Sequence, residues 1–358
     1  MYYHFKSSFV LLFNLITVTF IALALTSCKK ESLTDPVLNA TTTGNSSEKT
    51  VAARPQNVVV VKYGALIGAP AGVDDVNFQV TVADQLGISC LRERVTVPPK
   101  SLDTVLVPEL NTKYKIVLNF SSPGNGGGHP VAFRTDLDQY KTDLKNILNT
   151  FTVMPAVAVI ENEESNQSFY KGPAIDYINQ LKAAIQVMHA SGIQVTNGGL
   201  INPGINYLVY KDLLAQGKND SALLFKQQTS VMPDSPKTVK SGAFTDTLLA
   251  DYAKVNNLDF VNFHRKMLRP ADTISTNQVI NYLKKRTGKA IISNELGQFD
   301  TSPTTLTSTV RLCTKQGFPY MLWYSPDQNA GLKATPLQYP DATLTPNGIA
   351  YQNFIAGL

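Results

Sequence analysis

Short apolar runs bounded by polar residues recur along the chain from about residue 57 to its end. The clearest run is Val157–Ile160, which stops abruptly at Glu161. Apolar runs of this length are typical of strands that are covered on both faces, as in parallel sheets. We expect eight such strands, over residues 58–63, 88–95, 114–120, 157–160, 193–196, 260–264, 290–293 and 319–323.

Helical patterns lie between these runs, over residues 136–150, 174–189, 246–256, 277–286 and 304–315. Gly87, Gly192, Gly288 and Gly317 each stand where a helix would end before the next strand. Alternating strands and helices imply a parallel sheet. Eight such units in about 300 residues predict an α/β fold, a single-domain (β/α)8 TIM barrel over residues 57–358. A doubly wound open sheet is the alternative, but residues 64–68 match its glycine-rich phosphate turn poorly.

The connection between the fifth and sixth expected strands is longer than the others. It begins with the loop-forming residues 197–207 and later contains the proline-rich residues 232–236. Because loops that follow strands form the active face of a barrel, we expect this segment to wall the cleft. An extra helical hairpin with a structural role is the alternative.

The first 56 residues have a different character. Lys6 precedes an apolar run over residues 9–25, and the tetrapeptide that ends at Cys28 resembles the lipobox of bacterial lipoproteins. We therefore predict a signal peptide over residues 1–27, lipidation of Cys28, and a flexible tether over residues 28–56. The expected location is the bacterial cell envelope, lipid-anchored at the periplasmic face or on the outer surface of the outer membrane. An ordinary signal peptide or a single membrane anchor is the alternative, although the run is short for a bilayer span.

Composition excludes several function classes. Hydrophobic residues make up 43% of the chain and charged residues 16%, which is ordinary for a globular protein. The formal net charge of +5 is spread along the sequence, so we expect no nucleic-acid partner.

Cys90 and Cys313 lie in apolar segments and are expected to be buried free thiols. The few cysteines and histidines lack metal-ligand spacing, so we expect no structural zinc and no cofactor. We also expect a monomer.

Polar, charged and aromatic residues stand at the ends of most of the expected strands. In a (β/α)8 barrel the C-terminal ends of the strands form the active site. The residues concerned are Arg92, Asn119, Glu161, Asn162, Glu163, Glu164, His264, Asn294, Glu295 and Trp323. His129 lies in a glycine-rich loop after the third strand, from which it can overhang the cleft.

Two of these strand ends resemble the clan A glycoside hydrolases, retaining enzymes built on a (β/α)8 barrel. In that clan an Asn-Glu pair ends the fourth strand, as Asn162-Glu163 does here, and a second glutamate ends the seventh, as Glu295 does in Asn-Glu-Leu-Gly. Supporting matches are Arg92 on the second strand, His264 on the sixth and Trp323 on the eighth. The resemblance extends from about residue 57 to the end of the chain.

The resemblance implies hydrolysis of a β-linked glycan or glycoside with retention, by double displacement. Glu163 would be the acid and base, and Glu295 the nucleophile, with their carboxyl groups about 5 to 5.5 Å apart. At that distance Glu163 is expected to keep its proton near neutral pH. Arg92 would favour the ionised form of Glu295, and Asn162 would bind the sugar 2-hydroxyl.

Of the two remaining matches, His264 would orient the nucleophile or contact substrate, and Trp323 would form the floor of the subsite nearest the cleaved bond.

The chain departs from the pattern in two places. Glu164 follows the Asn-Glu pair where many members have proline, and Asn119 stands where several families have histidine. Trp323 is also the single tryptophan, so few strong sugar subsites are expected.

Other interpretations stay open. The protein is alternatively a non-catalytic glycan-binding lipoprotein on the same barrel. A third interpretation is that Glu161, Glu163 and Glu295 hold a divalent metal. Single residues have plainer alternatives as well: Arg92 in a rim salt-bridge network, residues 264–266 as a solvated basic turn, and Glu161 and Glu164 as rim charges.

Overall fold

A computed structural model of the chain describes residues 60–99, 103–124, 130–327 and 335–358. The predicted signal peptide, the lipidation of Cys28, the tether and the position of His129 lie outside the described residues and stay predictions.

The strands and helices alternate along the chain. The strands are β1 (Lys62–Ile67), β2 (Cys90–Thr96), β3 (Lys115–Ser121), β4 (Val131–Ala132), β5 (Val157–Ile160), β6 (Tyr170–Lys171), β7 (Gln194–Asn197), β8 (Phe260–Met267), β9 (Ala290–Gln298) and β10 (Tyr320–Ser325). The helices are α1 (Asp75–Leu86), α2 (Asp103–Asn111), α3 (Leu137–Leu148), α4 (Ala174–Ala190), α5 (Asn202–Ala215), α6 (Asn219–Thr229), α7 (Pro236–Tyr252), α8 (Thr273–Thr287), α9 (Pro303–Lys315) and α10 (Pro346–Ala356), with a 3-10 turn η1 (Pro270–Asp272) before α8.

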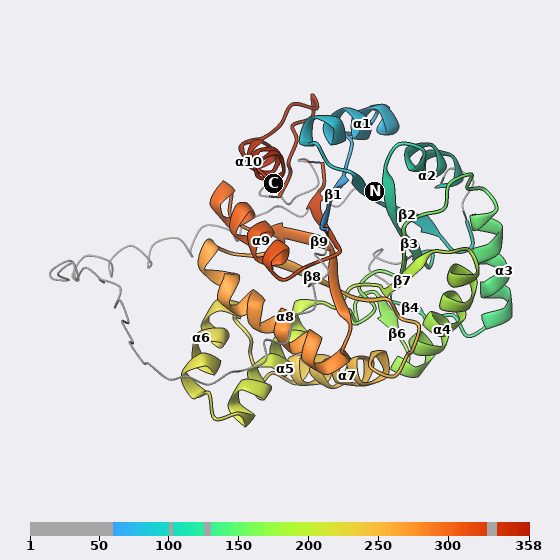
Figure 1. Ribbon diagram of the computed structural model, residues 1–358. Helices are drawn as coiled ribbons and strands as arrows, with labels where there is room; N and C mark the ends of the chain where they lie inside the picture. Colours follow the sequence, from blue (N-terminus) through green and yellow to red (C-terminus); the bar gives the residue numbers. More distant parts are fainter. Residues whose placement is uncertain (1–59, 100–102, 125–129, 328–334) are drawn as a thin grey trace, which may run out of the picture. The chain divides into compact units, whose positions relative to one another are not determined.

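Eight parallel strands close into a barrel in the order β1-β10-β9-β8-β7-β5-β3-β2, and the helices form a ring around it (Figure 1). The short strands β4 and β6 pair separately. Closure rests on β1 and β10, which pair from Lys62 with Tyr320 to Ile67 with Ser325. The predicted single-domain (β/α)8 barrel is confirmed, and the open-sheet alternative is excluded.

Most strands lie where the apolar runs predicted them, and β5 has the expected bounds. The first strand is the exception, since it begins at Lys62 rather than at residue 58. Val60 is 76% exposed, so the described part of the valine run before Lys62 does not begin as a buried strand. Position 64, inside the strand, has to be glycine because a Cβ there would come within 2.6 Å of the Cys90 carbonyl oxygen.

The helices also follow the predicted pattern, and Gly87 and Gly288 end α1 and α8 in the left-handed conformation. Four helices, α2, α5, α6 and α10, lie outside the predicted ranges, and α7 begins at Pro236, ten residues before its predicted start. Proline suits the first turn of a helix because its missing N–H has no intrahelical partner there. Pro236, the last residue of the proline-rich segment, therefore begins a helix.

The barrel interior is divided into two layers. The layer toward the N-terminal ends of the strands is apolar, and Cys90, Val117, Phe260, Ile292 and Leu322 belong to it. Two residues further along β2, β3, β8 and β9 the inward side chains become polar: Arg92, Asn119, Asn262 and Asn294. Because side chains alternate along a strand, this change places a polar layer directly beneath the active face.

Cys90 and Cys313 are buried free thiols, as predicted. Among the described residues, no helix has the length and apolar character needed to span a bilayer.

Candidate active site

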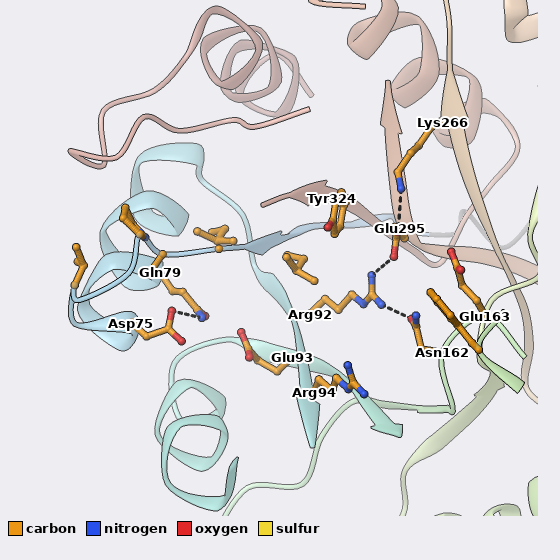
Figure 2. A pocket seen from close by; sticks show the side chains of 17 residues that line it. Asp75, Gln79, Arg92, Glu93, Arg94, Asn162, Glu163, Lys266, Glu295 and Tyr324 are labelled. Carbon is orange, nitrogen blue, oxygen red and sulfur yellow. Dashed lines mark hydrogen bonds and ion pairs between the residues drawn. The ribbon is translucent and has the colours of Figure 1, made fainter. Parts of the chain in front are cut away.

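A cleft of about 860 Å³ opens at the C-terminal ends of the strands (Figure 2). The first β–α connection, α1 and the ends of β2, β8, β9 and β10 contribute to its lining, together with the turn after β5. Arg92, Asn162, Glu163, Lys266, Glu295 and Tyr324 meet at one end of the cleft.

Glu295 faces this cleft because β9 contains an irregularity. Along β8 the register advances two residues from Asn262 to His264, whereas β9 advances three, from Ile292 to Glu295. The extra residue is a β-bulge, which changes the direction of the side chains that follow it. As a result the consecutive residues Asn294 and Glu295 both point into the barrel, where each makes contacts with inward-facing side chains.

Both carboxylate oxygens of Glu295 are paired with positive side chains. Arg92 Nη1 lies 2.6 Å from Oε2, and Lys266 Nζ lies 3.0 Å from Oε1, on the other side of the carboxylate in Figure 2. Burial raises the pKa of Glu295, but the attraction of His264, Arg92 and Lys266 outweighs burial and holds that pKa well below its ordinary value. Glu295 is therefore ionised at neutral pH.

Glu163 lies opposite, on a strained turn after β5. The φ angles of Glu161 and Glu163 are 66° and 56°, a region that costs a non-glycine residue free energy. The turn brings one oxygen of Glu163 within 4.8 Å of one oxygen of Glu295. His264 Nδ1 lies 3.1 Å from Glu163 Oε1, and Asn166 donates to Oε2 at 2.8 Å.

The pKa of Glu163 departs from expectation. Burial raises it and the charge of Glu295 adds to this, but the hydrogen bond and charge of His264 lower it, and the lowering prevails. The sequence predicted that Glu163 itself keeps a proton near neutral pH. That prediction is wrong for the free protein, because the adjacent imidazole stabilises the ionised carboxylate.

Glu161 and Glu164 are buried, so the prediction of rim charges is wrong. Glu161 accepts four hydrogen bonds, from Ser122 N–H, Ser122 Oγ, Tyr170 Oη and Gln180 Nε2, at 2.6 to 2.7 Å. Glu164 Oε1 accepts from Tyr252 Oη and from an asparagine of β7. These two carboxyl groups fix both ends of the turn that presents Glu163.

A layer of side-chain amides supports Arg92 from below. Asn119 Oδ1 accepts from Arg92 Nε at 3.1 Å and from Asn294 Nδ2 at 3.0 Å. Asn162 Oδ1 accepts from Arg92 Nη2 at 2.7 Å, which places Asn162 at the cleft wall. Arg92 is therefore part of the polar layer and not of a rim network, and Asn119 joins the site.

Trp323 is not at the site. Its side chain is 1% exposed, donates from Nε1 to the Thr335 carbonyl oxygen and packs beside Tyr351. Side chains alternate along β10, so Trp323 points away from the barrel interior while its neighbour Tyr324 lines the cleft. The predicted sugar-binding role of Trp323 is therefore wrong. Tyr324 is the residue of β10 whose aromatic ring lines the cleft.

The basic run at the end of β8 is not a solvated turn. Lys266 lines the cleft and His264 lies beside Glu163 and Glu295, whereas Arg265 points outward, is buried and bonds to Asn206 and Ser275. Lys266 Nζ also lies 4.7 Å from the centre of the Tyr324 ring, within cation–π range. Sequence reasoning missed Lys266, although the two-residue period of a strand from His264 points to it.

The proposed metal ligand set does not form. Glu161 is committed to its own hydrogen bonds, and the described His, Cys, Asp and Glu side chains that converge are Glu163, His264 and Glu295. Arg92 and Lys266 already pair with both oxygens of Glu295, and their charges oppose a bound cation.

The long connection after β7 is helical and does not line the cleft within the described residues. Its glycines lie against the site instead. A Cβ at Gly198 would come within 2.9 Å of Glu164 Oε2, and a Cβ at Gly199 within 2.2 Å of His264 Nε2. The helical alternative therefore replaces the predicted cleft wall.

Comparisons with known proteins address the fold. No sequence family and no curated protein matches the chain. Among solved structures, a GH128 (subgroup II) endo-beta-1,3-glucanase from Sorangium cellulosum has a TM-score of 0.55 at 12% identity, with 81% of this chain and 97% of that chain covered. A fungal beta-1,4-galactanase has a TM-score of 0.51 at 12% identity, with 81% and 98% covered. The chain shares their barrel fold. At this identity the likeness concerns architecture, so chemistry has to be argued from the site.

Proposed function

We propose that the protein is a glycoside hydrolase that cleaves a β-linked glycan with retention of configuration. The observation that supports this most directly is the approach of Glu163 to Glu295 within 4.8 Å in an open cleft. Retaining glycosidases hold their two carboxyl groups about 5 to 5.5 Å apart, whereas inverting enzymes leave about 6.5 to 9.5 Å for a water molecule.

In the proposed mechanism Glu295 attacks the anomeric carbon while a proton passes through Glu163 to the leaving oxygen. The ionised state of Glu295 suits a nucleophile. Water then cleaves the glycosyl-enzyme ester, and Glu163 accepts the proton of that water. Asn162 and Tyr324 would contact the sugar from the cleft wall. Beta-1,3-glucan and beta-1,4-galactan are the first substrates to assay, because the enzymes with similar solved barrels are named for acting on them.

Covalent trapping tests the proposal. The chain is incubated with a panel of 2-deoxy-2-fluoro glycosyl fluorides and examined by intact-mass and peptide mass spectrometry, beside the variant Glu295→Gln. A single sugar adduct on Glu295 that is absent from the variant is expected. Glycan binding that survives in the variant, with no adduct from any probe, would favour the alternative of a binding protein.

We further propose that Cys28 is lipidated and that residues 29–56 tether the barrel to a bacterial envelope membrane. Incorporation of labelled palmitate in a bacterial host, compared with the variant Cys28→Ser, tests this proposal. Equal labelling of the two proteins would contradict it.

A further inference from the structure

The ring of His264 lies between the two proposed catalytic carboxylates, and its surroundings determine where its hydrogens reside. Nδ1 is 3.1 Å from Glu163 Oε1 and 3.5 Å from Glu295 Oε2, while Nε2 is 2.9 Å from Asn294 Oδ1. The side chain is 5% exposed. The close approach of Gly199, where a Cβ would lie 2.2 Å from Nε2, leaves the ring little room to turn.

A chain of hydrogen bonds that starts at Arg92 fixes the Asn294 amide. The Arg92 Nε–H can only donate, so the atom of Asn119 that faces it is the oxygen. The same oxygen faces Asn294, which must therefore present its NH2 group to Asn119 and its oxygen to His264.

A second chain reaches the same result independently. The backbone N–H of Asn294 donates to Asn262 Oδ1 at 3.1 Å, so the Asn262 amide nitrogen is the group that faces Asn294 Oδ1, at 2.7 Å. Two obligatory donors, the Arg92 guanidinium and a backbone N–H, thus identify Asn294 Oδ1 as an acceptor. His264 Nε2 must carry a hydrogen to bond with it.

With Nε2 occupied, Nδ1 is the titratable nitrogen of the ring. If Nδ1 carried no hydrogen, its lone pair would face two carboxylates, which is unfavourable. The contact becomes favourable when one proton lies between Nδ1 and one of the carboxylate oxygens. The charged groups around the ring are Glu163 and Glu164 from the turn after β5, Glu295 from β9, Arg92 from β2 and Lys266 from β8. Arg92 and Lys266 both favour ionised Glu295, so the proton belongs to the other contact.

We propose that His264 and Glu163 hold one proton between Nδ1 and Oε1, and that this pair is the proton source for the leaving group. The inference rests on the proposed function for its chemical step. During glycosyl transfer the proton leaves Nδ1, passes through the Glu163 carboxyl and bonds to the departing oxygen, while Glu295 bonds to the sugar. The ring is then neutral with hydrogen on Nε2. The attacking water returns a proton to Glu163 in the second step, and from there to Nδ1.

Nitrogen NMR of the free protein tests the proton's location without any substrate. The chain contains four histidines, so a protein labelled with 15N in its histidine rings gives a simple spectrum, and the variant His264→Asn assigns the signals. We expect Nε2 of His264 to carry hydrogen at every pH at which the protein is folded. At pH 7 we expect the fraction of Nδ1 that carries hydrogen to fall about tenfold in Glu163→Gln, because a paired anion is removed.

Glu164→Gln is the matched control, since it makes the same chemical change at the next residue without touching the ring, and it should alter Nδ1 much less. His189, which bonds to Asp259 at a distance from the site, gives an internal reference signal. A bare Nε2, or equal occupancy of Nδ1 in the native chain and in Glu163→Gln, would overturn the proposal.

Kinetics give a readout that a merely structural role would not produce. If hydrolysis is established, His264→Asn should slow aryl glycosides with poor leaving groups at least tenfold more than those with good ones, because acid assistance matters most for poor leaving groups. An equal loss for both would refute the role in proton supply. Absence of hydrolysis for every glycoside would refute the proposed function instead, and the NMR result would still decide the proton's place.

Discussion

At the scale of single residues, the pairing of both Glu295 oxygens sets how the site should respond to acid. Arg92 is buried, and its guanidinium bonds to Glu295, Asn119 and Asn162 at once. A planar fork of donors suits this geometry, whereas a lysine could satisfy fewer of these partners. The nucleophile therefore depends on Arg92 for both its orientation and its charge.

We predict that Arg92→Met shifts the acid limb of the pH profile of kcat/KM to higher pH. Arg92 lowers the pKa of Glu295, so its removal raises that pKa and a larger share of the nucleophile is protonated in mild acid. Breaking the buried pair should also cost about 3 to 5 kcal/mol of stability. Arg94→Met is the control, because Arg94 lines the same cleft without contacting Glu295. An unchanged acid limb in Arg92→Met would contradict the assigned electrostatics.

Glu164 should make the protein less stable as the pH rises. Burial raises its pKa to about 7, although Tyr252 and Asn197 bond to its oxygen, and Oε2 has no hydrogen-bond partner among the described groups. Between about pH 4.5 and 7 the folded chain holds a proton that the unfolded chain releases. The free energy of unfolding should therefore fall with rising pH, by up to about 1.4 kcal/mol per unit.

Glu164→Gln imitates the protonated acid and should flatten part of this dependence, with greater stability than the native chain above pH 7. Urea unfolding at several pH values measures this pH dependence of the free energy of unfolding. The control is Glu109→Gln, which makes the same change at an exposed residue. Glu93, whose pKa is raised to about 8, changes in the same direction and remains in both variants. A native slope retained in Glu164→Gln would contradict the assignment.

At the scale of elements, the turn after β5 has to hold two left-handed non-glycine residues. The network on Glu161 supplies that constraint. Each oxygen of the Glu161 carboxylate accepts two donors, and Tyr170 Oη also accepts from the backbone N–H of Asn162. Four donor groups can all be satisfied only by a side chain whose two oxygens carry no hydrogen.

We predict that Glu161→Gln harms the site more than its small chemical change suggests. The new NH2 group must face two donors, which leaves buried groups unpaired at about 1 to 3 kcal/mol each. The turn should relax, so kcat should fall at least tenfold with a smaller effect on KM. Glu164→Gln is the matched control, because its oxygen keeps both partners. Native stability and native kcat in Glu161→Gln would show that the network does not position Glu163.

The pattern of buried residues explains a success of prediction on β5 and β9 and a failure on β10. The acids at the ends of β5 and β9 were predictable because buried runs stop there. Trp323 was misplaced because the alternation of a strand gives two choices of face, and a lone aromatic residue fits either the core or the cleft. The bulge in β9, which turns Glu295 inward, has no signal in the apolar pattern.

We predict different consequences for two adjacent aromatic residues of β10. Tyr324→Leu removes a ring from the cleft wall and from beneath Lys266 Nζ, so KM for glycan should rise several-fold. Trp323→Phe leaves a gap in the core and should lower the melting temperature with little change in KM. Steady-state kinetics and thermal unfolding distinguish the two. A larger rise of KM in Trp323→Phe than in Tyr324→Leu would restore the role first predicted for Trp323.

At the scale of the molecule, the number and order of the strands were predictable because each strand has its own apolar run, and glycines mark the ends of four of the helices. What the sequence could not supply is long-range packing. Gly198 and Gly199 were predicted to lie in a loop that walls the cleft, yet the space beside each is taken by the turn after β5 and by His264. A glycine required by a neighbour distant in sequence has no local signature.

The packing of α5 against α7 gives a test of the separation between scaffold and site. Gly242 lies beside the Tyr207 ring, where a Cβ would come within 2.2 Å of Cδ1, so Gly242→Ala should force the helices apart at a cost of about 1 to 3 kcal/mol. These helices do not line the cleft, so kcat and KM at a temperature well below unfolding should stay within twofold of native. Gly357→Ala, whose added Cβ would have no neighbour closer than 3.4 Å, is the control for the substitution itself. A large loss of kcat in Gly242→Ala without a loss of stability would mean that the long connection reaches the chemistry after all.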